Sequence, residues 1–364
     1  MSHTTPKDQT IPHRAAPPAV RLADIVRDAL PQLGAVTQVQ RFALHAIANC
    51  RTGAFGARVL HCDGCRQSLV SPRSCGHRSC PRCQHQAASD WLDRQQRKLL
   101  PVDYYMATFT LPEGMRTLAR QQPTQVYNAM FAAAAQTLST FGRNDRKLRA
   151  SLGFCAVLHT HSRRLDYHPH LHVVMPGGGV DVKRRQWRTR SGNYLFNGRQ
   201  LANVFRTKLI HALKGAGLNL PRGLPARWIV HCDRVGSGLP ALTYLSRYLY
   251  RGVIQEQQIV AVDQAARTVT FSYQDGKTKQ TALRTLPVVA FVQLILQHVL
   301  PKGFRRARDY GFLHHNARRL IDLLHYVLQV VIQAAIVPVL RPFLCPHCQQ
   351  PMHVIGATPR AAVT

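Results

Sequence analysis

Acidic side chains are scarce in this sequence. Asp and Glu together number 17 against 48 Lys and Arg, which gives the 364 residues a formal net charge of +31. Enzymes built on clusters of carboxylates, such as many polymerases and glycosidases, are therefore excluded. A folded protein this basic repels itself, so we expect a polyanion beside it, and nucleic acid is favoured over an anionic membrane surface.

Long apolar segments are also lacking. The first thirty residues are polar and basic and contain no apolar signal-peptide core. The most apolar stretch, residues 320–344, contains Asp322, His325 and Gln333, which favours a buried amphipathic helix over a membrane span. No Walker loop is present, which excludes an attached helicase. We therefore expect a cytoplasmic, nucleoid-associated protein with no membrane partner and no small-molecule substrate.

Apolar residues make up 45% of the chain, enough for a sizeable core. Two β-rich segments, 154–161 and 168–175, flank a polar turn and predict a hairpin. Residues 104–111 predict a further strand. Helical spacing is found in the segments 84–100, 116–140, 202–213, 241–251, 288–300 and 317–328. Hairpins interleaved with helices predict an α+β fold.

Eight of the ten cysteines fall into two groups in the sequence. Six lie between Cys50 and Cys83, and the other two are Cys345 and Cys348. Close Cys-x-x-Cys pairs in a chain without a signal peptide indicate metal sites in a reducing cytosol, not disulfides. The pairs Cys62-x-x-Cys65 and Cys80-x-x-Cys83 are separated by fourteen residues. Each short loop can bring two thiolates to one ion, so these four predict one tetrahedral zinc site.

The same segment leaves a second zinc site open. Cys50, Cys75 and His77 are surplus to one site, and His61 or His85 could join them. Arginines on the rim could contact phosphates, although a solvated face is the simpler interpretation. These arginines are Arg66, Arg73, Arg78 and Arg82.

The C-terminal run Cys345-Pro346-His347-Cys348 is half of a zinc ribbon. It has no partner pair nearby in the sequence. It could complete a metal site with another segment or another subunit, or it could be a remnant that binds no metal.

Three histidines alternate in His168-Pro169-His170-Leu171-His172. Alternate residues of a strand share one face, so these imidazoles point the same way and can bind a divalent metal ion. His159 and His161 share a face of the preceding strand. One of them could complete the coordination across the hairpin.

Tyr244 and Tyr248 are four residues apart on an expected helix and therefore lie on one face. Taken alone, the pair fits a helix packed in a core. Together with a histidine metal site and a basic chain, it suits phosphodiester transesterification. The metal polarises the scissile phosphate, and a tyrosine oxygen forms a covalent 5′-phosphotyrosine with unpaired DNA.

These motifs resemble those of a known family. His170-Leu171-His172 and Tyr244-x-x-x-Tyr248 resemble the motifs of two-tyrosine HUH single-strand endonucleases. The order of all motifs is similar to that of the two-tyrosine transposases of the insertion-sequence ninety-one family. It comprises the Cys-rich region, the strand 107–112, the His strand, the glycines 177–179, the Tyr helix, the segments 298–301 and 310–312, and the C-terminal Cys pair.

The resemblance implies an antiparallel HUH palm flanked by helices and preceded by a small zinc-binding domain. It implies Mg²⁺ or Mn²⁺ in the active site, zinc in the N-terminal domain and rolling-circle transposition through single-stranded DNA. The expected division is a tail and first helix (1–36), a zinc-binding domain (37–98), a catalytic domain (102–335) and a C-terminal segment and tail (336–364). Whether the chain forms a homo-oligomer is left open.

The resemblance also implies residue roles. His170 and His172 are metal ligands, and Tyr244 and Tyr248 are nucleophiles. His159 is expected as the third ligand, with His161 and His168 as competitors. Candidates for binding DNA phosphates are Arg247, Arg251, Arg305, Arg306 and Arg308.

Three alternatives remain. A rolling-circle replication initiator or relaxase would use the same residues. A non-catalytic zinc-ribbon DNA-binding protein would not need the intact histidine and tyrosine sets. A metallohydrolase commonly needs a carboxylate in its site, and Asp166 is the only acid near the histidine strand.

Overall fold

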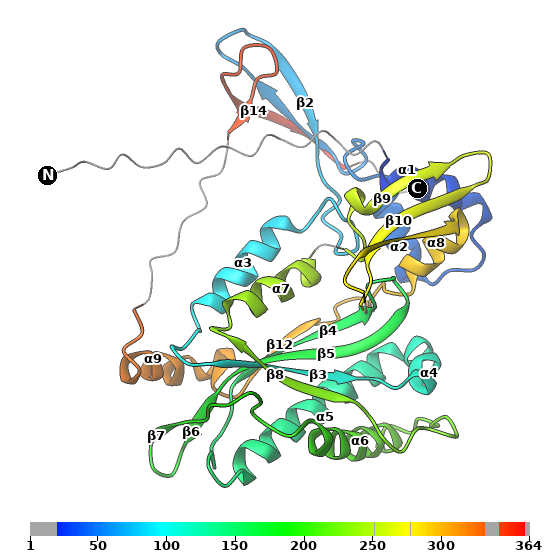
Figure 1. Ribbon diagram of the computed structural model, residues 1–364. Coiled ribbons are helices and arrows are strands. Elements are labelled where there is room, and N and C mark those ends of the chain that lie inside the picture. Colours follow the sequence, from blue (N-terminus) through cyan, green and yellow to red (C-terminus); the bar gives the residue numbers. More distant parts are fainter. Residues whose placement is uncertain (1–19, 251, 277, 332–341, 361–364) are drawn as a thin grey trace, which may run out of the picture.

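A computed structural model describes residues 20–250, 252–276, 278–331 and 342–360. Its centre is a five-stranded sheet in the order β12-β4-β5-β3-β8, in which every neighbouring pair is antiparallel (Figure 1). The strands are β3 (Tyr104–Thr110), β4 (Phe154–His161), β5 (Tyr167–Pro176), β8 (Val230–Gly236) and β12 (Ala307–Tyr310). The expected hairpin of β4 and β5 forms the middle of this sheet.

Helices cover both faces of this sheet (Figure 1). On one face, Leu171 and Val173 of β5 join a buried cluster with Phe205. That face is covered by α5 (Pro123–Asn144) and α6 (Gly198–Gly215). On the other face, Val174 packs with Leu245. That face is covered by α3 (His85–Gln96) and α7 (Leu239–Tyr250). The α+β prediction with an antiparallel palm is therefore confirmed.

A second core joins segments from three parts of the chain. It packs α1 (Leu22–Ala29), α2 (Gln38–Ala48) and α8 (Val288–Leu296) against the sheet of β9 (Ile259–Asp263), β10 (Thr268–Gln274) and β11 (Thr281–Pro287). Leu165, in the turn between β4 and β5, is buried in the same cluster. This core therefore crosses the boundary that the sequence predicted at residue 36.

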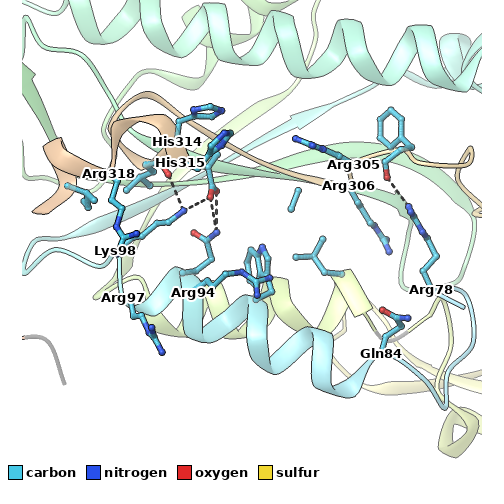
Figure 2. A pocket seen from close by; sticks show the side chains of 18 of the residues that line it. Arg78, Gln84, Arg94, Arg97, Lys98, Arg305, Arg306, His314, His315 and Arg318 are labelled. Atoms are coloured by element: carbon cyan, nitrogen blue, oxygen red, sulfur yellow. Dashed lines mark hydrogen bonds and ion pairs between the residues drawn. The ribbon is translucent and has the colours of Figure 1, made fainter. Parts of the chain in front are cut away.

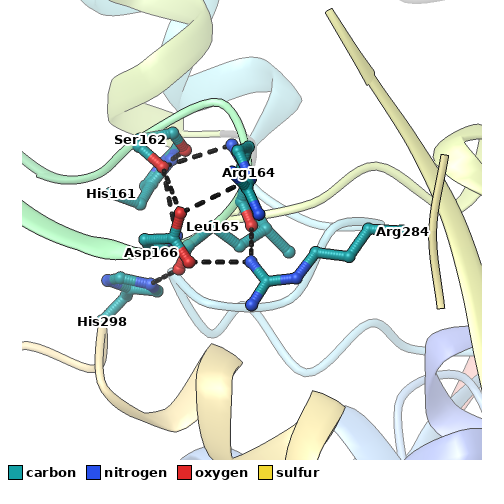
Figure 3. Close-up of polar contacts among 7 residues, drawn as sticks. All are labelled: His161, Ser162, Arg164, Leu165, Asp166, Arg284 and His298. Atoms are coloured by element: carbon teal, nitrogen blue, oxygen red, sulfur yellow. Dashed lines mark hydrogen bonds and ion pairs between the residues drawn. The ribbon is translucent and has the colours of Figure 1, made fainter. Parts of the chain in front are cut away.

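Polar contacts tie that turn to the second core (Figure 3). The Nη1 atom of Arg284 on β11 donates to the Arg164 carbonyl at 2.6 Å and to Oδ1 of Asp166 at 2.8 Å. The Nε2 atom of His298 donates to the Leu165 carbonyl at 2.8 Å. Asp166 therefore has a structural partner at the tip of the hairpin. It is not among the groups that the described residues could offer to a metal.

A third unit is a small four-stranded sheet in the order β13-β14-β1-β2. Its strands are β1 (Ala57–His61), β2 (Ser68–Pro72), β13 (Phe343–Leu344) and β14 (Pro351–Thr358). Figure 1 shows β2 and β14 standing away from the five-stranded sheet. The two ends of the chain thus build one sheet, which the sequence did not predict.

The remaining elements differ from the sequence expectation in detail. The expected helix over 116–140 is two helices, α4 (Arg116–Gln121) and α5, because Pro123 begins a new helix. A short hairpin of β6 (Gly178–Asp181) and β7 (Gln186–Thr189) was not expected. In the apolar stretch, α9 spans Arg318–Val327, and residues 332–341 lie outside the described part. No described helix combines the length and the apolar character needed to cross a membrane.

Candidate active site and metal centres

Three histidines meet on the face of the central sheet that α7 covers. His159 on β4 is the register partner of His170 on β5, and His172 follows two residues later on the same face. The ring centroid of His159 lies 5.2 Å from that of His170 and 4.4 Å from that of His172. One nitrogen of each ring lies within 4.8 Å of the other two. The structure therefore brings the expected third ligand to the expected pair.

Hydrogen bonds fix how two of these rings present their nitrogens. Nδ1 of His170 donates to the carbonyl of His168 at 2.6 Å, which leaves Nε2 as an acceptor. Nδ1 of His172 pairs with the Thr108 hydroxyl at 3.1 Å. Such contacts to one nitrogen orient a metal-binding imidazole and select its tautomer. Nε2 of His159 is buried and has no hydrogen-bond partner among the described residues, as expected for a ligand atom of a metal ion.

Burial keeps the three imidazoles neutral. It lowers the pKa of His170 to about 4 and that of His172 to about 3. The pKa of His159 also falls well below its usual value because the ring is buried and faces the other two. A neutral imidazole offers a lone pair, and three convergent lone pairs without a carboxylate form a nitrogen-donor site for a divalent cation.

The two other candidates for the third metal ligand, His161 and His168, contact different groups. His161 stacks near Tyr248 and packs edge-to-face against His298, and its Nδ1 lies 3.1 Å from the carbonyl of Ser162. Nδ1 of His168 accepts from Arg116 at 3.0 Å. Neither belongs to the group of convergent nitrogens among the described residues.

Tyr244 and Tyr248 of α7 lie over the histidines. The rings of Tyr244 and Tyr248 are 4.7 Å apart, and Tyr248 stacks on His159 at 4.5 Å. Tyr244 lies farther from that ring, at 6.3 Å. Burial, followed by the charge of Tyr248, raises the pKa of Tyr244. The sequence alone also allowed an ordinary core pair, but both rings are only partly buried.

Gly238 directly precedes α7, which is called the tyrosine helix below because it carries Tyr244 and Tyr248. Gly238 has φ +81°, and a Cβ atom there would lie 2.6 Å from Cγ of Tyr104. Only glycine allows this close approach of the chain to Tyr104 on β3 without strain. The start of α7 is thereby held against the sheet that carries the histidines.

A cavity of about 310 Å³ adjoins the tyrosine pair. This volume is at the lower end of the range of ligand pockets. Both tyrosines, Arg163 and the exposed Arg247 line it. A chain segment with a phosphate could thus reach the two hydroxyl groups from solvent. The phosphate candidate Arg251 lies outside the described residues.

A larger, strongly cationic cavity of about 970 Å³ lies beside the outer edge of the sheet, at β12. Leu249 of α7 and Arg306 line it, so it neighbours the tyrosine helix. Figure 2 shows the cations around it, which come from four separate parts of the chain. They are Arg78, Arg94, Arg97, Lys98, Arg305, Arg306 and Arg318.

The arginines that the sequence predicted to bind phosphates therefore lie in different parts of the structure. Arg305 and Arg306 line the cationic cavity. Nε of Arg306 donates to the Leu158 carbonyl at 2.8 Å, and burial lowers its pKa to about 10. The guanidinium of Arg308 lies over the Phe131 ring at 4.1 Å instead. The cations at the C-terminal end of α3, Arg94, Arg97 and Lys98, were not predicted to bind phosphates because a basic helical face is ordinarily solvated.

The structure corrects the expected grouping of the cysteines. Cys62 and Cys65 do not meet Cys80 and Cys83. One group joins Cys50, Cys75, Cys80 and Cys83, and the other joins Cys62, Cys65, Cys345 and Cys348. The spacing within each Cys-x-x-Cys pair does not predict which pairs share a metal site. The pairing of β1 with β14 brings Cys345 and Cys348 to Cys62 and Cys65.

The first group consists wholly of N-terminal residues. The sulfur of Cys83 lies 3.7 Å from that of Cys50 and 3.5 Å from that of Cys75. His77 is not a member, and its backbone N–H donates to the sulfur of Cys75 at 3.4 Å. Four convergent thiols are the donor set of a structural zinc site. The N-terminal part of the chain therefore holds a candidate zinc site.

The first cysteine group also lies beside the segment that follows the helix of Tyr244 and Tyr248. Gly252 follows α7, and a Cβ atom at this position would lie 3.1 Å from the carbonyl of Ser79. Arg82 pairs with Glu256 at 3.8 Å in the segment that follows. A metal held by this group would therefore stabilise the loop that ends the tyrosine helix.

Comparison with known proteins gives two family matches. Residues 153–320 match a family described as "Putative transposase", and residues 22–111 match a family described as "Transposase zinc-binding domain". The second match begins within α1 and so includes the first helix, unlike the domain expected over 37–98.

Two curated proteins are similar in sequence. "Putative transposase y4qJ" of Sinorhizobium fredii (strain NBRC 101917 / NGR234) is 34% identical over 78% of this chain and 76% of its own length. "Transposase for insertion sequence element IS801" of Pseudomonas savastanoi pv. phaseolicola is 28% identical over 72% of this chain and 68% of its own length.

Among solved structures, the conjugative relaxase TrwC in its metal-bound complex with oriT DNA is 17% identical. The match covers 53% of this chain and 70% of the relaxase chain, with a TM-score of 0.29. A likeness of this size is too weak to support a conclusion about the chain.

Proposed function

Since this chain belongs to the insertion-sequence ninety-one (IS91) family of transposases, we propose that it nicks and rejoins single-stranded DNA at the ends of a transposable element. The proposed intermediate is a 5′-phosphotyrosine, and the proposed process is rolling-circle transposition. The single observation that carries the proposal is the position of two tyrosines directly over three convergent histidines.

The proposed reaction is an exchange of phosphate esters. A tyrosine oxygen attacks the scissile phosphorus and loses its proton, the new O–P bond forms, and the bond to the 3′ oxygen breaks. The released 3′ oxygen takes up a proton. Attack of a 3′ hydroxyl on the phosphotyrosine reverses these steps and rejoins a strand. No external energy source is needed, because one phosphate ester replaces another.

The second tyrosine suits the strand-transfer step. Tyr244 and Tyr248 share one helical face, with ring centroids 4.7 Å apart. One tyrosine could hold a cleaved 5′ end while the other attacks a second phosphate. The proximity of two nucleophiles at one site makes the second attack effectively intramolecular.

His159, His170 and His172 are the residues proposed to hold Mg²⁺ or Mn²⁺. When bound there, the ion would supply Lewis-acid polarisation of the phosphate. The chain itself keeps the three rings neutral through burial and orients two of them by hydrogen bonds. An all-imidazole donor set suits transition-metal ions better than Mg²⁺, so we expect Mn²⁺ to bind more tightly.

The cationic cavity at β12 is proposed as the path of the DNA strand beside the active site. Seven Lys or Arg side chains line it, against the two acidic residues Asp309 and Asp322. Phosphate binding by Lys and Arg depends little on sequence and supplies most of the affinity for a strand. Localisation at the nucleoid would follow from such binding.

The test uses labelled single-stranded DNA from the ends of the element that encodes the protein. Incubation with Mn²⁺ should give a DNA adduct that is sensitive to protease and absent from the Tyr244→Phe/Tyr248→Phe double variant. Tyr326→Phe, at an exposed tyrosine of α9, is the matched control and should retain the adduct.

Two results would contradict the proposal. Absence of an adduct with any divalent ion would favour a non-catalytic DNA-binding protein. An adduct that persists in the double variant would place the nucleophile elsewhere. A replication initiator would form the same adduct, so transposition of a marked element in cells is the assay that separates the two functions.

A further inference from the structure

The second cysteine group is assembled from both ends of the chain. We propose that Cys62, Cys65, Cys345 and Cys348 bind a second zinc ion, which fastens the C-terminal strand β14 to the N-terminal strand β1. The matched zinc-binding domain ends at residue 111 and so does not include the C-terminal cysteines. Cys65 and Cys345, whose sulfur atoms lie 3.4 Å apart, are separated by 280 positions.

The two halves of this group have the same local structure. The N–H of Cys62 donates to the carbonyl of Gln67, and the N–H of Cys345 donates to the carbonyl of Gln350, both at 2.9 Å. Each pair therefore closes a loop of equal length with an equal hydrogen bond. This is the form of a loop that presents two sulfur atoms to one metal ion.

The backbone angles repeat as well. The residue after the second cysteine is left-handed in both loops, with φ +58° at Arg66 and φ +59° at Gln349. Non-glycine residues adopt this conformation rarely, and a matched pair of them indicates a shared structural demand. The first zinc group repeats the feature at Gln84, with φ +70° after Cys83. The C-terminal loop thus resembles the loop of a group that lies wholly in the matched zinc-binding domain.

The loops face one another across the site. A Cβ atom at Gly64 would lie 3.7 Å from the sulfur of Cys348. The sulfur of Cys62 lies 3.4 Å from that of Cys348, and all four sulfurs lie within 4.8 Å of one another. A tetrahedral site with Zn–S bonds of about 2.3 Å has sulfur atoms about 3.8 Å apart. The observed separations are close to that value and far from the S–S bond of about 2.05 Å in a disulfide.

The small sheet lacks a core that could stabilise it otherwise. Its buried hydrophobic cluster comprises Leu60, Cys62, Cys345 and Met352, so half of the cluster is metal-binding cysteine. Several large apolar side chains of its strands remain exposed. These are Leu69, Val70, Phe343, Leu344, Val354 and Ile355. A unit with so little buried apolar surface ordinarily requires a metal or a disulfide to fold.

The position of β14 shows what the ion would do. β14 lies between β13 and β1, and Ala57 to His61 pair with Thr358 to His353. One ion held by both loops would fix this register between strands almost three hundred residues apart. Its loss should release the C-terminal strand and leave the first zinc group intact.

The test is the zinc content of the full-length protein after purification under reducing conditions, measured by mass spectrometry of the metal. We expect two zinc ions per chain. The Cys345→Ser/Cys348→Ser variant and the Cys75→Ser/Cys83→Ser variant should each retain one. Cys155→Ser/Cys232→Ser, at the two cysteines outside both groups, should retain two. Cys348→His should also retain two, because imidazole replaces thiolate in many zinc sites.

Retention of two ions in Cys345→Ser/Cys348→Ser would overturn the proposal, as would a single ion in the unaltered protein. A second measurement does not depend on the folding of a variant. In the unaltered protein, alkylation of Cys345 and Cys348 should be slow until a zinc chelator is added. Equal rates with and without the chelator, or a disulfide between Cys65 and Cys345 in the isolated peptides, would also overturn it.

Discussion

The ring of Tyr248 stacks on the ring of His159, with their centroids 4.5 Å apart and their planes 17° apart. His159 belongs to β4, and Tyr248 belongs to the helix that covers this strand. A proposed nucleophile is thereby fixed against a proposed metal ligand before any substrate binds. Such preorganisation removes part of the entropic cost of bringing the reacting groups together.

Tyr248 should perform the first cleavage. It lies closer than Tyr244 to the ring of His159, and burial raises the pKa of Tyr244, which makes that hydroxyl harder to ionise. Tyr248→Phe should slow formation of the first DNA adduct by about 10³-fold or more. Tyr244→Phe should leave that rate within about tenfold but prevent transfer to a second strand. Single-turnover kinetics with labelled DNA would measure both rates, and the reverse order would refute this assignment.

Removal of the third imidazole should weaken the active-site metal. His159→Gln should raise the dissociation constant for Mn²⁺ by about 100-fold, because even outer contacts of a metal site cost about 10- to 100-fold. Calorimetric titration of the zinc-loaded protein with Mn²⁺ would show it. His231→Gln, at an exposed histidine of β8, should have no effect. If His161→Gln weakened binding as much as His159→Gln, the third ligand would be His161.

Acid should destabilise the fold through His298. Burial lowers its pKa to about 4, and its Nδ1 has no hydrogen-bond partner in the described part of the chain. The folded state therefore binds fewer protons than the unfolded state, whose histidines have a pKa of about 6.5. The resulting contribution to the free energy of unfolding, on the order of 3 kcal/mol, is fully present above pH 6.5. It is lost as the pH falls from 6.5 through 4.

The measurement for His298 is urea unfolding at several pH values without added divalent metal. The unaltered protein should lose more free energy of unfolding between pH 7 and 4 than His298→Gln does. Other buried histidines and the zinc sites contribute to both proteins, so only the difference tests His298. Equal losses in the two proteins would show that His298 does not titrate in this range.

DNA affinity should fall steeply with salt, and two cations at the C-terminal end of α3, Arg94 and Arg97, should set part of the slope. Arg94 and Arg97 line the cationic cavity and are exposed. Each change to Gln should reduce the slope of log K against log salt by about 1. The control Arg199→Gln lies on α6, which covers the opposite face of the sheet (Figure 1), and should leave the slope unchanged. An equal change in the control would mean that the cavity is not the DNA path.

The histidine and tyrosine arrangement was largely readable from the sequence. His170 and His172 share a strand face by their period of two. The choice of His159 over His161 came from the family resemblance, because the pairing of His159 with His170 follows a register shift between His159 and His161 that the sequence did not predict. Tyr244 and Tyr248 share a face by helical spacing. These are local relationships within one hairpin and one helix. That α7 lies over the hairpin is not local and came from the family resemblance.

The cysteine groups and the cationic cavity depend on contacts between distant segments. Cys62 meets Cys348 because β1 pairs with β14, and no spacing within either loop encodes that pairing. The cavity combines α3, β12 and the segment around Arg318 in the same way. A sequence pattern identifies the residue types, but long-range strand pairing decides which of them become neighbours.

The most direct test of the proposed chemistry is identification of the residue linked to DNA. The adduct formed with Mn²⁺ would be digested with protease and nuclease, and the nucleotide-bearing peptide would be sequenced by mass spectrometry. The expected result is a 5′-phosphotyrosine on Tyr248 or Tyr244. A cleaved strand with a free 5′ phosphate and no modified peptide, or a linkage to any other residue, would contradict the account.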